Sequence, residues 1–143
     1  MDSHSEPSAQ ADDGQHVIRD LRQADEEMRA AIDALTRARR MRVFEFFRSV
    51  NTDPKHRGSE EVHVGHAVTA LLNAERLVRG ASKRVHDLPV DHETRRTLGP
   101  PVRALETRIS GLMVSLREQP DPAKLISGLK AARRIVPNRV VRG

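Results

Sequence analysis

The chain has 143 residues, which is enough for one domain with a hydrophobic core and too few for two ordinary domains. Its aromatic residues are three Phe, with no Trp or Tyr, and its other large apolar residues are aliphatic, so packed helices are favoured over a β-sandwich or barrel. The absence of cysteine excludes disulfides, thiolate metal ligands and cysteine nucleophiles, while the formal charge of +5 is compatible with an anionic partner and selects none.

Residues 1–14 are predicted to form a disordered acidic tail, because they contain almost nothing apolar to bury. The tail has no Lys or Arg, and its acidic residues are Asp2, Glu6, Asp12 and Asp13. This leaves a formal charge of +9 on residues 15–143, which are predicted to form a single domain. The sequence contains no secretory signal pattern and no apolar run of the roughly 18 residues that span a membrane, so we expect a soluble, cytoplasmic protein.

The residues from His16 to about Val50 predict a long first helix, of roughly 50 Å at 1.5 Å per residue. Its apolar positions alternate in steps of four and three, as they do along the seam of a helical bundle or coiled coil. These positions are Val17, Leu21, Ala24, Met28, Ala31, Leu35 and Ala38. Beyond Ala38 the apolar positions shift to Met41, Phe44, Phe47 and Val50, so we expect the helix to continue with a rotated face.

A second helix is predicted from an N-cap at Ser59 to about Leu88, after a loop over residues 51–58 that contains Pro54. Its central stretch shows apolar residues at helical spacing. The predicted core face is Leu71, Leu72, Leu77, Val78, Ala81 and Val85.

Proline and glycine divide the rest of the chain. Pro89 ends the second helix, Asp91 is predicted to cap a short segment, and a third main helix is predicted to begin at about Pro100. Asp121 is the predicted N-cap of a fourth helix, which Pro137 ends. The predicted core faces of these two helices are Val102, Leu105, Ile109, Leu112 and Leu116, and Leu125, Ile126, Leu129, Ala132 and Val136. The sequence therefore predicts an all-α fold, an antiparallel bundle of four main helices with a long first helix.

Metal binding and catalysis have little support in the sequence. Glu60, His63 and His66 share the spacing of a metal-binding helix, but only one such pair is present, and we interpret it as a capping carboxylate beside two exposed histidines. Asp25, with the two glutamates that follow it, is predicted to lie on a solvated face opposite arginines. There is no phosphate-binding glycine loop, zinc-protease motif or serine-nucleophile motif. We therefore expect no metal, no cofactor and no enzymatic activity.

Two arginine clusters are candidate anion-binding sites, for nucleic acid or an anionic membrane surface. They consist of Arg37, Arg39, Arg40, Arg42 and Arg48 near the end of the first helix, and Lys130, Arg133, Arg134, Arg139 and Arg142 around the end of the fourth. Cations also stabilise helix C-termini, which is where both clusters lie. No aromatic residues alternate with these cations to stack bases.

Phe44, Phe46 and Phe47 form the candidate protein-binding surface. An apolar cluster with an arginine rim is typical of an interface core, although the same rings could instead fill the core of the domain. Helices of unequal length leave part of the first helix uncovered. We therefore interpret the chain as a non-enzymatic interaction module that forms a homodimer or docks to another protein, with nucleic-acid or membrane-surface binding as the alternative.

Four stretches, RARRMR, HAVTALLNAERLVRGASKRV, LGPPVRALETRISGLMVSL and QPDPAKLISGL, follow one another along the chain. In this succession, residues 20–136 resemble the helical cytoplasmic C-terminal region of fusaric-acid-resistance-like membrane proteins, which are aromatic acid exporters. The resemblance implies an accessory bundle that is attached to an anion exporter or works beside one. The chain departs from that family in having no transmembrane helices, so transport itself is not implied.

Overall fold

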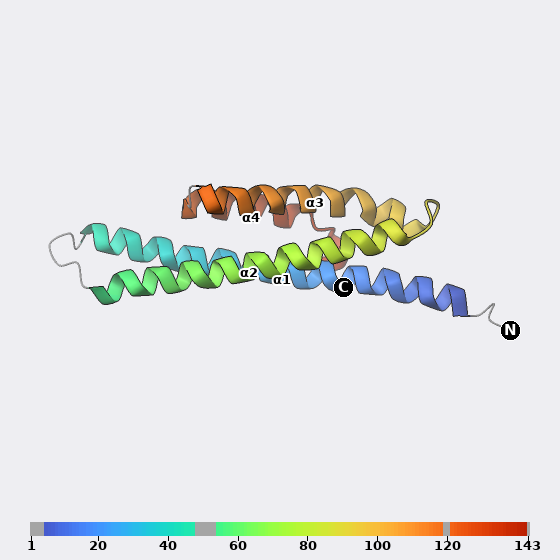
Figure 1. The fold of residues 1–143 in the computed structure, drawn as a ribbon, viewed down its shortest axis with the longest axis horizontal. Helices are drawn as coiled ribbons and strands as arrows, with labels where there is room; N and C mark the ends of the chain where they lie inside the picture. Colours follow the sequence, from blue (N-terminus) through green and yellow to red (C-terminus); the bar gives the residue numbers. More distant parts are fainter. Residues whose placement is uncertain (1–4, 48–53, 119–120, 143) are drawn as a thin grey trace.

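The computed structural model describes the backbone of residues 5–47, 54–118 and 121–142, and the side chains of residues 14–41, 61–118 and 121–141. Throughout these ranges the chain consists of helices joined by turns, so the all-α prediction is confirmed (Figure 1). The helices are α1 (Ser5–Phe47), α2 (Pro54–Asp87), α3 (Glu93–Glu118), α4 (Pro122–Ile135) and α5 (Asn138–Arg142). No helix in the described ranges is both long enough and apolar enough to cross a membrane.

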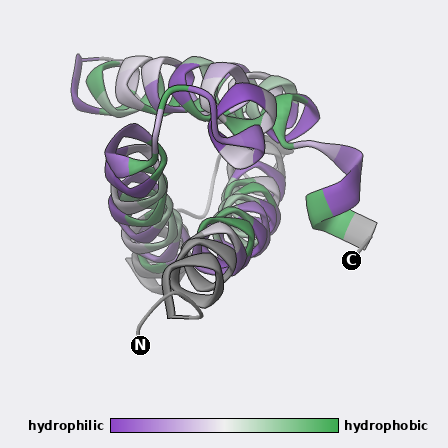
Figure 2. Cartoon of the chain, turned by 90° about the vertical axis from the view of Figure 1, so that its right-hand side faces the viewer, coloured by the Kyte–Doolittle hydropathy of each residue, from purple (hydrophilic) through white to green (hydrophobic). Residues whose placement is uncertain are grey.

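The helices α1 and α2 form a long hairpin, and the pair α3 and α4 packs along one side of it (Figure 1). Within this arrangement α3 contacts α2, α4 contacts α1, and α3 and α4 contact each other. The short α5 turns away from α4 at the side of the bundle and packs on α1 (Figure 2). The predicted antiparallel bundle of four main helices is therefore confirmed.

The predicted seam of α1 is confirmed, because every seam position from Val17 to Ala38 is at most 3% exposed. Three of the seven seam residues are alanines, which allow α1 and α2 to approach closely. One core prediction on α2 is wrong, since Leu72 is 45% exposed and lies outside the core. Leu77 on α2 and Leu116 on α3 are only partly buried, at the edge of the core.

The first two helices begin earlier than the sequence analysis predicts. The helix α1 starts at Ser5, so it includes residues 5–14, which were expected to be disordered. Pro7 costs no hydrogen bond there, because the first four N–H groups of a helix have no intrahelical acceptor. The helix α2 starts at Pro54, since proline at the first helical position is tolerated for the same reason, and Ser59 is therefore not an N-cap.

The third helix is continuous from Glu93 through Pro100 and Pro101, so the predicted interruption before Pro100 is wrong. A proline in a helix leaves the carbonyl four residues earlier without its usual donor. Here those carbonyls belong to the exposed residues Arg96 and Thr97, where water can hydrate them. The N-cap is His92 in place of the predicted Asp91, because His92 Nδ1 accepts a hydrogen bond from the Thr94 N–H at 3.1 Å.

The start of α4 agrees with the prediction. Asp121 is the N-cap, with its carboxylate accepting a hydrogen bond from the Ala123 N–H at 3.1 Å, and Pro122 occupies the first helical position. The helix ends at Ile135, just before Pro137. The predicted core face of α4 is buried throughout.

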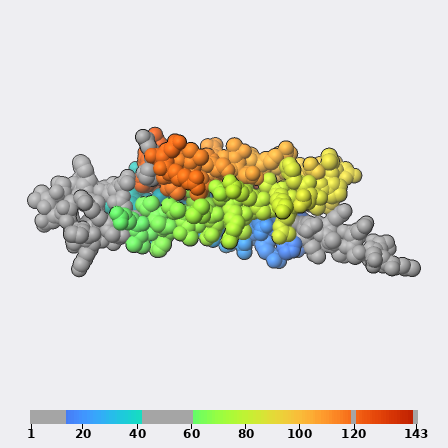
Figure 3. Space-filling model, in the orientation of Figure 1, coloured from blue at the N-terminus to red at the C-terminus, as the bar shows by residue number. Residues whose placement is uncertain are grey.

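The hairpin is longer than the pair of helices that covers it. At 1.5 Å per residue, the 43 residues of α1 span about 65 Å, whereas the 14 residues of α4 span about 21 Å. The closed end of the hairpin projects beyond α3 and α4, and the N-terminal end of α1 projects at the opposite end (Figure 1). In the space-filling view, α3 and α4 lie along one side of the coloured part of the hairpin (Figure 3).

Candidate functional site

Asp25 is the charged residue that lies in the described core, with a relative exposure of 7%. Arg133 on α4 binds the Asp25 carboxylate through two hydrogen bonds: Nε donates to Oδ1 at 2.8 Å, and Nη2 donates to Oδ2 at 3.2 Å. The prediction that Asp25 lies on a solvated face is therefore wrong. Asp25 directly follows the seam residue Ala24, and on that side of α1 the covering helix is α4.

The ion pair is partly shielded from water, with the Asp25 side chain 9% exposed and the Arg133 side chain 27% exposed. The hydrogen bond to Asp25 is the main cause that raises the pKa of Arg133 above its ordinary value, and the negative charges of Asp25 and Asp33 act in the same direction, against partial desolvation. Arg133 therefore remains a cation. A second contact ties the chain end to α1, since Arg22 Nε donates to the Val140 carbonyl at 2.9 Å.

An open pocket lies around this ion pair, between α1, α4 and α5, with a volume of about 450 Å³. We call it the α4 pocket. Its lining combines three cations, the Asp25 carboxylate, one amide and two valines. The lining residues are Asp25, Lys130, Arg133, Arg134, Val136, Asn138 and Val141. A concave site with several positive charges and one carboxylate already paired is suited to an anion.

The structure separates the two predicted arginine clusters. Arg133 and Arg134 both line the α4 pocket, but Arg133 is committed to Asp25 while Arg134 is exposed. Arg37, Arg39 and Arg40 are exposed on α1 and do not line that pocket. The side chain of Arg42 lies outside the described residues. Lys130, a predicted member of the second cluster, also lines this pocket, whereas Arg139 is exposed and does not. The side chains of Arg48 and Arg142 also lie outside the described residues. Asp25 was not predicted as the buried carboxylate of the site.

The candidate protein-binding residues Phe44, Phe46 and Phe47 belong to the last turn of α1, at the projecting end of the hairpin. Their side chains lie outside the described residues. The protein-binding role of these rings therefore stays a prediction, and so does the alternative that they fill the core.

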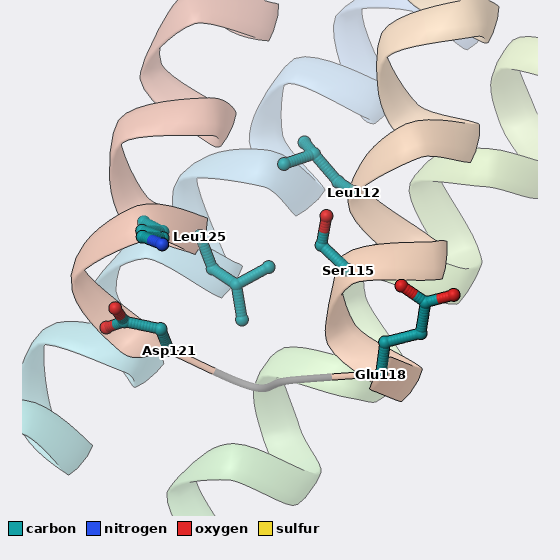
Figure 4. Close-up of a pocket in the computed structure, with 6 residues that line it drawn as sticks. Leu112, Ser115, Glu118, Asp121 and Leu125 are labelled. Carbon is teal, nitrogen blue, oxygen red and sulfur yellow. The ribbon is translucent and has the colours of Figure 1, made fainter.

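A second pocket, of about 380 Å³, lies at the turn between α3 and α4 (Figure 4). Leu112 and Leu125 extend from the two helices into the space between them, with Ser115 beside them and the carboxylates of Glu118 and Asp121 near the turn. The Asp121 carboxylate is already used as the N-cap of α4. The capping carboxylate and the core leucines have structural roles at this turn, so they do not indicate a binding site.

The histidine pair on α2 falls short of a metal site in the described part of the chain. The ring centroids of His63 and His66 are 6.4 Å apart in a T-shaped arrangement. His63 is half-buried and its Nδ1 atom has no described hydrogen-bond partner, whereas His66 is exposed. No group of three metal-ligating side chains occurs among the residues whose side chains are described, and the side chain of Glu60 lies outside them.

Comparison of the chain with protein-family models, with curated proteins and with solved structures found no match.

Proposed function

We propose that this chain is a non-enzymatic helical interaction module that forms an antiparallel homodimer along α1. The observation that supports this most is the projection of α1 from the bundle at both ends (Figure 1). An α-helical stretch that its own domain leaves uncovered gains stability when a partner covers it.

The two projecting ends of α1 carry opposite charge, which favours a second copy as the partner. Residues 5–14 contain three carboxylates, Glu6, Asp12 and Asp13, and no Lys or Arg. Residues 37–47 contain four arginines and one glutamate. Two α1 helices that run antiparallel would place the acidic end of each beside the basic end of the other.

The same arrangement accounts for the phenylalanines at the end of α1. A dimer with twofold symmetry uses the same surface on both subunits, so Phe44, Phe46 and Phe47 of each copy would pack on the acidic end of the other. In this proposal the apolar rings contribute the buried area, and the charges select the antiparallel orientation.

The test is sedimentation velocity with light scattering over a range of protein concentrations. We expect a dimer that weakens as salt rises, since exposed charge pairs are screened within about 8 Å at physiological ionic strength. Replacing Arg37, Arg39 and Arg40 with Glu should give a folded monomer. A matched triple replacement of the exposed Arg76, Arg79 and Lys83 on α2 with Glu should leave the dimer intact.

A charge-exchange experiment tests the orientation. The Arg37, Arg39 and Arg40 to Glu variant should form a mixed dimer with a variant in which Glu6, Asp12 and Asp13 are replaced with Lys. Phe46→Glu should remove association while helix content stays at the wild-type level. If the wild type is a monomer at all concentrations, the proposed dimer is refuted. If Phe46→Glu simply unfolds, the interface role of the rings is refuted.

A further inference from the structure

The α4 pocket contains three cationic side chains and one carboxylate, so its lining has a net positive charge. Asp25 is neutralised by Arg133 through two hydrogen bonds. Lys130 and Arg134 are exposed, and neither forms an ion pair with a carboxylate among the residues whose side chains are described. They are four residues apart on α4, so both side chains extend from the same face of the helix. We propose that this pocket binds a phosphate group, carried by a small molecule or by a lipid headgroup.

Arg133 can serve the pocket while it holds Asp25. A guanidinium has five N–H donors, and only Nε and one Nη2 donor are used by the carboxylate. The remaining donors are available for an acceptor on the pocket side, in the planar geometry that suits phosphate. The carboxylate orients the guanidinium, so this donor group is positioned before a ligand arrives.

The other lining groups specify the class of ligand. The volume of about 450 Å³ is that of a small-molecule site. None of its described lining residues is aromatic, so these residues offer no surface on which a nucleobase would stack. The Asn138 amide adds a donor, while Val136 and Val141 offer an apolar surface for the carbon part of a phosphate ester. The carbonyls at the end of α4 oppose an anion, and the charges of Lys130 and Arg134, which Asp25 does not neutralise, outweigh this partial negative charge.

The pocket lies on α4 and α5, whereas the proposed dimer uses the projecting ends of α1. The two proposals therefore rest on different observations and can fail separately.

Isothermal titration calorimetry with inorganic pyrophosphate is the first test, because the chain has no Trp or Tyr to report binding by fluorescence. The binding variant is Lys130→Gln with Arg134→Gln, which leaves the Asp25–Arg133 ion pair intact. The control is Arg79→Gln with Lys83→Gln, which removes one arginine and one lysine at the same spacing from an exposed face of α2. Circular dichroism should show that both variants keep the wild-type helix content and melting temperature.

We expect one pyrophosphate site per chain in the wild type and the control, and affinity weakened about tenfold or more in the binding variant, because two charge-assisted contacts are lost. A second arm measures binding to vesicles with and without phosphatidic acid. Binding of pyrophosphate alone identifies a soluble phosphate ligand, and binding of phosphatidic-acid vesicles that also requires Lys130 and Arg134 identifies a headgroup. The proposal is overturned if pyrophosphate does not bind, or if the two variants lose equal affinity. An oligonucleotide that binds with the same loss in both variants would indicate diffuse attraction between the basic domain and a polyanion.

Discussion

The Asp25–Arg133 ion pair should contribute measurably to stability, and removal of either partner tests this. In Arg133→Met the aliphatic stem is kept while the carboxylate of Asp25, which is 9% exposed, loses its only described ion-pair partner. We expect the free energy of unfolding to fall by about 2–4 kcal/mol. This is slightly less than the loss of about 3–5 kcal/mol that is typical when a fully buried ion pair is broken, because the Arg133 side chain is 27% exposed. At roughly 2–4 °C per kcal/mol for a chain somewhat larger than this one, the melting temperature should fall by at least about 4 °C.

The reciprocal change should cost less. In Asp25→Ala the guanidinium of Arg133 can turn towards solvent, so we expect a loss of about 1–2 kcal/mol. The double variant should recover part of the combined loss, with a coupling energy of about 1–3 kcal/mol. The raised pKa of Arg133 contributes stability that is fully present below the ordinary pKa of arginine and is lost only when the pH rises through the folded-state value, so neutral buffers are suitable.

Urea unfolding followed by circular dichroism at 222 nm measures all four corners of this cycle, and urea avoids the ionic screening that guanidinium would add. The control is Arg79→Met, which breaks an exposed pair with Glu75 at 3.5 Å and should cost less than about 0.5 kcal/mol. A stabilising role of the ion pair is refuted if Arg133→Met is no more destabilising than Arg79→Met, or if the coupling energy is zero within error.

Two further pairs of substitutions test the packing of the bundle by the same unfolding assay. Gly111→Ala should raise the free energy of unfolding by about 0.5–1 kcal/mol, because the added methyl group meets nothing within 4 Å. Gly128→Ala should lower it by about 1–2 kcal/mol, because the methyl group would overlap the side chain of the buried Leu112; equal stability of the two glycine variants would show that Leu112 moves aside. Leu129→Ala should cost about 2–4 kcal/mol, since Leu129 is fully buried. Leu72→Ala should cost less than about 0.5 kcal/mol, since Leu72 is 45% exposed, and a comparable loss at both leucines would contradict the described core.

Features that depend on neighbours along the chain could be predicted from the sequence. The seam of α1 from Val17 to Ala38 is confirmed because a repeat of four and three residues places side chains on one helix face whatever packs against it. The N-cap at Asp121 is confirmed for a similar reason, since its partner, the Ala123 N–H, is only two residues away. Both predictions use contacts within one or two helical turns.

Predictions that depend on surroundings were less accurate. Leu72 has the spacing of a core residue, but whether it is buried depends on where α1 and α3 pack on α2. Pro100 and Pro101 would break a buried helix, yet here the carbonyls that lose their donors belong to exposed residues. Water can satisfy such groups, and the sequence does not show which side of the helix faces solvent.

The main feature of the candidate site could not be predicted, because Asp25 and Arg133 are 108 residues apart in the chain. Read alone, each belongs to a charged run that is typical of a solvated surface: Asp25 precedes two glutamates, and Arg133 precedes another arginine. Only the packing of α4 on α1 brings them together. Detecting the pair from sequence would require evidence that the two positions change together among relatives.

The ion pair also accounts for why the α4 pocket has a defined shape. The helix α4 has only 14 residues, and its contacts with α1 include the ion pair between Arg133 and Asp25. Moving Arg133 away from Asp25 would break both hydrogen bonds to this buried carboxylate, and this cost favours the observed packing. At the chain end, the hydrogen bond from Arg22 to the Val140 carbonyl fixes α5 against the same helix. Since these two contacts position α4 and α5 on α1, Lys130, Arg134 and Asn138 are arranged around the pocket before any ligand binds.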